Sequence, residues 1–253
     1  DQIKFANPNC LYIANEGILT NENNVLIADG NGGYTCENLV LDVTKPFRIP
    51  GTITTTNASA KKSVSEAGYA TMVLPFEVSV PERVTAYKLT SVEGEKVMGE
   101  ALANIPAGQP VLLKANAADY TFTATGATLA TDQQPDGEGL LNGVYADDYA
   151  PAGSYVLQNQ NGNVAFYKVQ NADEQKVKQY TAYLLPESVQ QANRLIFALG
   201  EDDVTDVEGV EVTAAAATVV EIYDLSGRQV NTPVKGINLM KMSDGTVKKV
   251  IVK

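Results

Sequence analysis

The chain has 253 residues, of which 44% are hydrophobic and 19% are charged, and its formal net charge at pH 7 is -11. This composition excludes wholesale disorder, because the apolar residues are numerous enough to offset the entropy of ordering the chain. The acidic balance argues against nucleic-acid binding, which needs clustered Lys and Arg residues, and no apolar run approaches the roughly 20 residues that a membrane span requires.

Two cysteines, Cys10 and Cys36, occur in the N-terminal part of the chain. In an oxidising compartment, a disulfide between them would close a loop of about 25 residues and contribute on the order of 3 kcal/mol by restricting the unfolded chain. The alternative is a pair of buried free thiols, because the sequence does not show whether the two Cα atoms lie within bonding reach. Both alternatives stay open at this point.

Alternating apolar residues predict several half-buried strands. The longest run covers residues 71–80, with Pro75 expected at an edge or a bulge because proline lacks the N–H that a central strand donates. Shorter runs cover residues 39–43 and 195–199. The residues predicted to share one face in each run are Met72, Leu74, Phe76, Val78 and Val80; Leu39, Leu41 and Val43; and Leu195, Phe197 and Leu199.

Asn-Gly and Asp-Gly pairs recur along the chain and favour tight hairpins. The clearest predicted hairpin runs from residues 155–157 through a turn at Asn161–Gly162 into residues 164–167. The Pro-Ala-Gly sequences at 106–108 and 151–153 each predict a turn that leads into a strand. The pairs are Asp29–Gly30, Asn31–Gly32, Asp136–Gly137, Asn142–Gly143, Asn161–Gly162 and Asp244–Gly245.

The sequence contains no convincing amphipathic helix. The Ala-rich residues 214–217 are few and run into β-branched residues, and residues 186–193 make at most a short helical turn. We therefore predict an all-β fold, with one or more antiparallel β-sandwich-like domains and a small C-terminal β module.

Composition divides the chain into four segments. Residues 1–66 are a β-rich region that is either separate or part of the main domain, and residues 67–200 are the main β-sandwich-like domain. Residues 201–209 are acidic and read as a linker, and residues 210–253 are the C-terminal β module. The first boundary rests on the polar stretch 52–68, which is also compatible with a long surface loop.

The tail of the chain has the features of a miniature β module. Residues 219–230 read VVEIYDLSGRQV, and residues 235–239 and 248–253 follow as KGINL and KKVIVK. Ser226–Gly227 can turn between short strands, and lysines on the last strand suit an exposed edge. This pattern resembles the C-terminal sorting domain of proteins exported by the type IX secretion system of Bacteroidota. The resemblance implies an export or anchoring segment; the alternative is a pair of terminal hairpins that only completes the fold.

Motifs in the rest of the chain, at residues 7–12, 36–41, 68–76 and 105–108, resemble recurring sequence in surface proteins of the same group. The resemblance implies a non-catalytic, structural or adhesion-like region, extracellular or on the outer cell surface. Its expected partners are surface glycans, host or neighbour-cell proteins and the upstream domains of a longer precursor. The first residues lack a basic region followed by an apolar core, so we expect a removed signal or a fragment.

Several classes of catalytic and metal site are excluded by residue type. The chain has no His, which removes Ser-His-Asp and Cys-His catalysis, and two cysteines cannot form a closed four-ligand zinc site. The acidic pairs at 93–95, 136–138 and 147–148 lie among turn residues and are expected to be solvated. The loop 29–33 begins like a calcium site, but Gly33 occupies a ligand position, so a turn is expected. We predict no catalytic residue, no metal and no cofactor.

The alternative function is a carbohydrate-binding module that presents Tyr and Asn or Asp side chains from the loops of a β-sandwich. Tyr145, Tyr149, Tyr155 and Tyr167 are the candidates for an exposed binding face. Packing in strands and core is the other use of such aromatic residues, and the absence of Trp weakens the case for sugar recognition.

Overall fold

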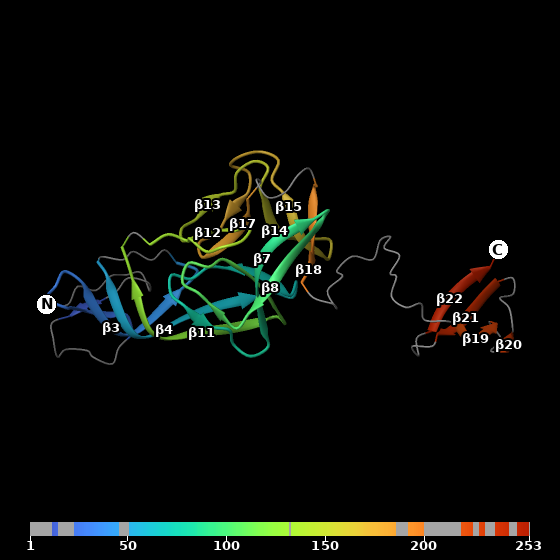
Figure 1. The fold of residues 1–253 in the computed structure, drawn as a ribbon, viewed down its shortest axis with the longest axis horizontal. Helices are drawn as coiled ribbons and strands as arrows, with labels where there is room; N and C mark the ends of the chain where they lie inside the picture. Colours follow the sequence, from blue (N-terminus) through green and yellow to red (C-terminus); the bar gives the residue numbers. More distant parts are fainter. Residues whose placement is uncertain are drawn as a thin grey trace. The chain divides into compact units, whose positions relative to one another are not determined.

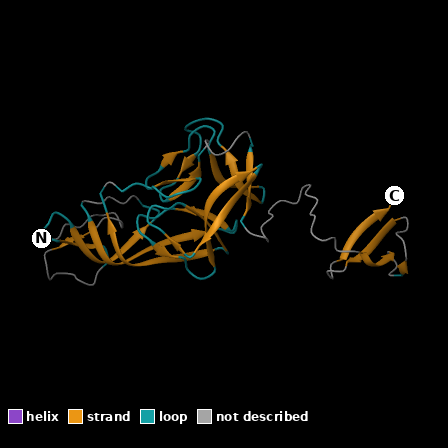
Figure 2. Cartoon of the chain, viewed as in Figure 1, coloured by secondary structure: helices purple, strands orange, loops and turns teal. Residues whose placement is uncertain are grey.

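The computed structural model describes residues 12–14, 23–45, 51–131, 133–185, 192–199, 219–224, 228–230, 236–242 and 247–252. The chain divides into two compact units, unit 1 (Asp1–Asp206) and unit 2 (Val207–Lys253). Every regular element in the described ranges is a strand (Figure 2), so the predicted all-β, sandwich-like fold is confirmed. A helix long and apolar enough to cross a membrane is absent from this described part.

Unit 1 contains two large sheets and one small one (Figure 1). The first sheet has seven strands in the order β1-β2-β3-β4-β11-β6-β9. Its pairs are mostly antiparallel, but β1 with β2 and β3 with β4 are parallel. Its strands are β1 (Tyr12–Ala14), β2 (Val25–Ala28), β3 (Tyr34–Asp42), β4 (Ile53–Val64), β6 (Val78–Ser79), β9 (Asn104–Ile105) and β11 (Ala118–Leu129).

The second sheet has nine strands in the order β12-β17-β14-β15-β18-β8-β7-β10-β5, with β18 and β8 parallel. A separate two-stranded sheet pairs β13 (Asp148–Tyr149) with β16 (Lys176–Val177). The nine strands are β5 (Tyr69–Met72), β7 (Val84–Glu93), β8 (Lys96–Leu102), β10 (Val111–Ala115), β12 (Leu141–Val144), β14 (Tyr155–Gln160), β15 (Asn163–Lys168), β17 (Thr181–Leu184) and β18 (Arg194–Ala198).

The nine-stranded sheet rolls until its two ends nearly meet. Ala182 N, on the second strand in the order, donates to Thr71 Oγ1 on the last strand at 3.1 Å. Val73 N donates to Tyr180 O at 3.2 Å beside this contact. The rolled sheet is therefore barrel-like, and its junction lies next to the segment that joins the two large sheets.

Two hydrophobic cores share the strands β7 and β10. The sandwich core lies between the seven-stranded sheet and β5, β7 and β10, and it includes Leu39 and Phe122 from one side and Leu113 from the other. The barrel core fills the rolled sheet, where the rings of Phe166 and Phe197 meet edge to face at 5.7 Å. Because side chains alternate along a strand, β10 buries Leu113 in the first core and Leu112 in the second.

The prediction of one strand over residues 71–80 is wrong in one respect. Met72 ends β5 and Val78 begins β6, so the run crosses from one sheet to the other. Pro75 lies in this crossing, where its missing N–H removes no ladder bond. The predicted common face is confirmed, since its five apolar residues all belong to or pack against the sandwich core.

Residues 53–64 form the long central strand β4, although the polar composition of this stretch predicts a boundary or a surface loop. It pairs with β3 on one side and β11 on the other. The inward positions hold small residues, Ala58 and Ala60, and the outward ones hold Thr, Ser and Lys, so the strand has low hydropathy despite its central place. Residues from the segments 1–66 and 67–200 thus share one sheet.

The turn predictions had mixed outcomes. The hairpin of β14 and β15 is confirmed, and Asn161 (φ 53°) and Gly162 (φ 87°) both have the positive φ of a tight turn. Both Pro-Ala-Gly sequences form hydrogen-bonded turns before a strand, with Pro106 and Pro151 as the accepting residues. Asn142–Gly143 instead lies inside β12 and makes no turn. Asp244–Gly245, the acidic linker and most of the helical turn predicted at 186–193 fall outside the described residues.

Unit 2 is a four-stranded antiparallel sheet in the order β20-β19-β21-β22. Its last strand in sequence lies at one edge, as the lysine-rich ending predicts. The strands are β19 (Val219–Asp224), β20 (Gln229–Val230), β21 (Gly236–Met242) and β22 (Val247–Val252).

Candidate ligand-binding pocket

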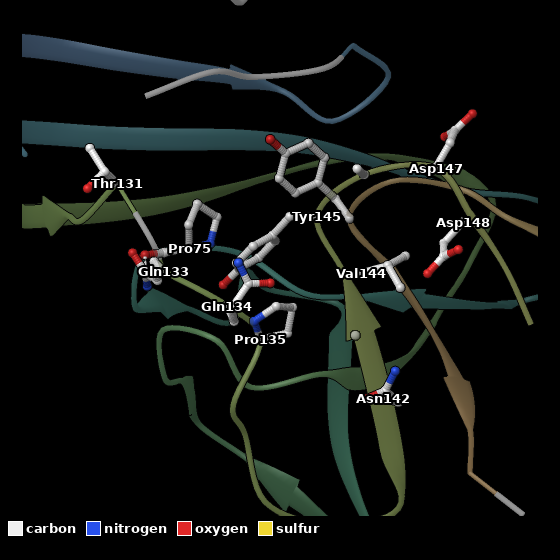
Figure 3. Close-up of a pocket in the computed structure, with 13 residues that line it drawn as sticks. Pro75, Thr131, Gln133, Gln134, Pro135, Asn142, Val144, Tyr145, Asp147 and Asp148 are labelled. Atoms are coloured by element: carbon white, nitrogen blue, oxygen red, sulfur yellow. Dashed lines mark hydrogen bonds between the residues drawn. The ribbon is translucent and has the colours of Figure 1, made fainter. Parts of the chain in front are cut away.

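A pocket of about 590 Å³ opens in unit 1 between the segment after β11 and the turn after β12 (Figure 3). Gln133 and Pro75 lie at one end, Asp147 and Asp148 at the other, and Tyr145 between them. The volume falls within the range of small-molecule sites. The lining residues are Pro75, Thr131, Gln133, Gln134, Pro135, Asn142, Gly143, Val144, Tyr145, Ala146, Asp147, Asp148 and Tyr180.

Tyr180 forms part of the pocket wall in a strained backbone conformation. Its φ is 56°, in the left-handed region that a bulky residue rarely adopts, and only 2% of it is exposed. Its N–H donates to Val144 O at 2.7 Å and its carbonyl accepts from Val73 N, so both backbone groups are satisfied. Such conformations cost about 1–3 kcal/mol and persist only where surrounding contacts fix them.

Tyr145 packs against Tyr180, with ring centroids 5.9 Å apart and planes inclined by 44°. The Tyr145 hydroxyl donates to Leu74 O at 3.3 Å. Burial, and then the negative charge of Asp136, raise the pKa of Tyr145 well above its ordinary value. The phenol therefore stays neutral, and its half-buried ring is held in a fixed orientation.

Gln133 carries an unsatisfied polar atom. Its Nε2 donates to Pro75 O at 2.7 Å, which fixes the orientation of the side-chain amide. Its Oε1 is buried and has no hydrogen-bond partner in the described part of the chain, the only such side-chain atom there. Because an unpartnered buried acceptor costs about 1–3 kcal/mol, this atom is suited to accept a donor from a ligand.

The acidic end of the pocket is held by lysines. Asp147 accepts from Lys176 Nζ at 2.7 Å, lies 3.7 Å from Lys178 Nζ, and accepts from Gln179 N at 3.0 Å. The hydrogen bond from Lys176 is the main reason that the pKa of Asp147 is lowered. Asp148 Oδ1 accepts from Tyr149 N at 2.8 Å. Both carboxylates keep lone pairs that can accept from hydroxyl groups.

The four candidate tyrosines do not form one face. Tyr145 lines the pocket and Tyr149 is exposed on β13, but Tyr155 is fully buried and its hydroxyl donates to Ala192 O at 2.6 Å. Tyr167, on β15, lines a different groove of about 330 Å³, and its hydroxyl donates to Asn163 O. The structure therefore brings only the first of them into the pocket.

The other sites considered from the sequence are structural features. Asp29 Oδ1 accepts from Asn31 N at 2.7 Å and Gly33 N at 2.9 Å, so the loop closes as a turn on its own carboxylate. Cys36 is buried on β3, and burial raises the pKa of its thiol. Cys10 lies outside the described residues, and the Cys10–Cys36 disulfide stays a prediction. Groups of three metal-ligating side chains are absent from the described ranges.

Sequence reasoning missed Gln133 and Tyr180, the residues that most distinguish the pocket. Gln133 follows the end of β11 in a segment without regular structure, and Tyr180 lies in the turn between β16 and β17. The Gln and Pro residues at 133–135 were the sequence feature that could have indicated a surface segment, because such a run is unsuited to a strand.

Comparison with known proteins adds no assignment, since no family model, no curated protein and no solved structure matches the chain. The fold and the pocket define the class: an all-β module with a small-molecule-sized pocket that has aromatic, amide and carboxylate groups.

Proposed function

We propose that the protein is a non-catalytic, adhesion-like surface module and that its pocket binds carbohydrate. The observation that carries this proposal is the unpartnered Gln133 Oε1 in the wall of a polar pocket that also contains the half-buried ring of Tyr145. Sugars present hydroxyl donors beside apolar C–H faces, and this pairing of an amide acceptor with an aromatic ring suits them.

The charged end of the pocket supports the same ligand class. Asp147 and Asp148 add acceptors for hydroxyl groups, and Asn142 adds an amide with both donors and an acceptor. Asp147 is engaged by two lysines and holds a lowered pKa, which suits a fixed acceptor and not a general acid at neutral pH. The proposal is therefore recognition without bond cleavage.

A glycan array with the whole chain tests the proposal, followed by calorimetric titration of each glycan that binds. We expect saturable binding that weakens about tenfold in Gln133→Leu, which removes the unpartnered acceptor. Gln160→Leu is the matched control, because Gln160 is exposed at the end of β14 and outside this pocket. If no glycan on the array binds, or if both variants lose affinity equally, the carbohydrate proposal is contradicted and only a structural role remains for the protein.

A role of unit 2 in export or anchoring is a second proposal, supported by its separate sheet. Its strands β19, β20, β21 and β22 coincide with the residues that resemble the sorting domain. The chain would be expressed behind a signal peptide in a Bacteroidota host with type IX machinery, with and without residues 207–253. We expect surface display to be lost on truncation while periplasmic protein accumulates. Equal display of both chains would contradict an export or anchoring role.

A further inference from the structure

A second cavity of about 760 Å³ borders the pocket, and the two share Ala146 and Asp147. We call this neighbouring cavity the lysine groove. It borders the turn after β12, which contains Ala146 and Asp147, and it also borders the end of β4. Its polar lining includes Lys61, Lys62, Ser63, Lys178, Gln179 and Thr181.

Lys62 points to the core side of its sheet. Along β4 the buried residues Ala58, Ala60 and Val64 occupy alternate positions, and Lys62 lies in the same alternation, opposite Tyr120 of β11. Inward positions of a sandwich normally hold apolar residues, whereas Lys62 is a charged residue that is partly buried there. The placement of Lys62 therefore needs a reason.

The Lys62 ammonium has no counter-ion within the described residues. Its neighbour Lys61 pairs with Asp119 at 2.7 Å, and Lys178 shares Asp147 with Lys176. The backbone of Lys62 is paired in the β4–β11 ladder, but its side chain makes no ion pair or hydrogen bond in the part of the chain that the structure describes. Burial lowers the pKa of Lys62 to about 8, so the amine is still mostly protonated at neutral pH.

The groove has an excess of positive charge in an acidic protein. Its charged lining residues are three lysines, Lys61, Lys62 and Lys178, and one carboxylate, Asp147, whereas the whole chain has 30 acidic and 19 basic residues. A partly desolvated cation attracts an anion more strongly than an exposed one, because water screens the pair less. The groove therefore favours an anionic group from outside the chain.

We propose that the lysine groove binds an oxyanion substituent of an acidic glycan, a carboxylate or a sulfate ester, with Lys62 as its main partner. This inference rests on the proposed carbohydrate pocket, because the neutral part of the same glycan lies in that pocket across Ala146. Thr181 and Gln179 line the groove and add polar groups beside the anion. The glycan thus spans both cavities.

The test is calorimetric titration of the whole chain with two matched pairs of probes. One pair is tetragalacturonic acid and its fully methyl-esterified form, and the other is a sulfated galactan tetrasaccharide and its unsulfated form. We expect the charged member of at least one pair to bind about tenfold more tightly, and the pair that shows the preference identifies a carboxylate or a sulfate. Added salt should weaken the charged member selectively.

Lys62→Met should abolish the preference and leave the neutral member's affinity unchanged, whereas Lys96→Met should retain it. Lys96 is the matched control, since it lies on β8 and lines neither cavity. Equal affinity of charged and neutral members overturns the inference and leaves the carbohydrate pocket standing. A preference that survives in Lys62→Met overturns it as well. Absence of binding by all four probes overturns the inference, and a flat glycan array overturns the pocket proposal too.

Discussion

Gln109 clamps Glu138 through two hydrogen bonds, with Gln109 Nε2 donating to Glu138 O at 2.8 Å and Gln109 Oε1 accepting from Glu138 N at 3.0 Å. The Gln109 residue is only 5% exposed. Residues 133–138 form no strand, yet three of them line the pocket. The side chain of Gln109 therefore supplies the hydrogen bonds that a strand partner would otherwise give this wall.

Replacing Gln109 with Leu should lower the free energy of unfolding by about 2 kcal/mol, because the two bonds to the Glu138 backbone are lost together with the bond from Gln109 Nε2 to Pro110 O. Urea denaturation measures this change. The same variant should weaken glycan binding, since the wall at residues 133–135 loses its anchor. Gln160→Leu removes an exposed amide, whose one hydrogen bond within the described residues goes to the Gln158 side chain, and should change stability by less than about 0.5 kcal/mol. Similar losses in both variants would contradict the clamp.

Gly139 and Gly126 offer a matched pair for the cost of adding a Cβ atom. Both have positive φ, 100° and 72°, but a Cβ at Gly139 would collide with the Leu89 carbonyl oxygen, whereas at Gly126 it meets open space. Gly126→Ala should cost about 1 kcal/mol from backbone strain alone. Gly139→Ala should cost at least about 1 kcal/mol more, measured by denaturation. Equal costs would show that the segment around Gly139 moves away from the Leu89 carbonyl oxygen without a loss of stability.

Tyr155 and Tyr167 allow a buried hydroxyl group to be compared with one near the surface. Tyr155→Phe removes the donor to Ala192 O from a fully buried ring and should lower stability by about 1 kcal/mol. Tyr167→Phe removes a weaker 3.3 Å bond near the surface and should be close to neutral. Thermal unfolding of the two variants checks the difference, and the opposite order would count against a structural role for the Tyr155 hydroxyl.

Much of the fold follows from local pattern. The alternation of Leu39 and Leu41, and of Leu195 and Phe197, identified buried faces correctly because the side-chain period of a strand is fixed at two. The central strand β4 was missed because Ala58 and Ala60 fill its inward positions. Its burial comes from partners distant in sequence, β3 and β11, and local composition does not encode them.

The pocket was less accessible to sequence reasoning. Asp147 and Asp148 were noted as turn carboxylates and Tyr145 as a candidate aromatic residue, but their shared position depends on the way the nine-stranded sheet rolls. Gln133 reaches the pocket through a hydrogen bond to Pro75, 58 residues earlier in the chain. The positive φ of Tyr180 also has no local signal, because the residue type disfavours it and the contacts with Val144 and Val73 impose it.

The partly buried amine of Lys62 predicts an unusual dependence of stability on pH. Burial lowers its pKa from 10.5 to about 8, so between these two values the unfolded chain binds a proton that the folded chain has lost. The free energy of unfolding therefore increases as the pH rises from 8 toward 10.5. Below pH 8 both states are protonated, so Lys62 adds no pH dependence there and the full cost of its charge remains.

Lys62→Met should accordingly stabilise the protein at pH 7 by about 1–3 kcal/mol, since it removes the cost of keeping a charge at a core-facing position. The gain should shrink as the pH approaches 10, where the wild-type amine is already neutral when folded. Urea denaturation of both proteins at pH 7, 8, 9 and 10 measures the difference, and Lys96→Met serves as the control that should show no such trend. A Lys62→Met protein that is less stable at pH 7 would mean that the ammonium is satisfied in the folded chain, and the groove would then have no unpaired cation for an anionic ligand.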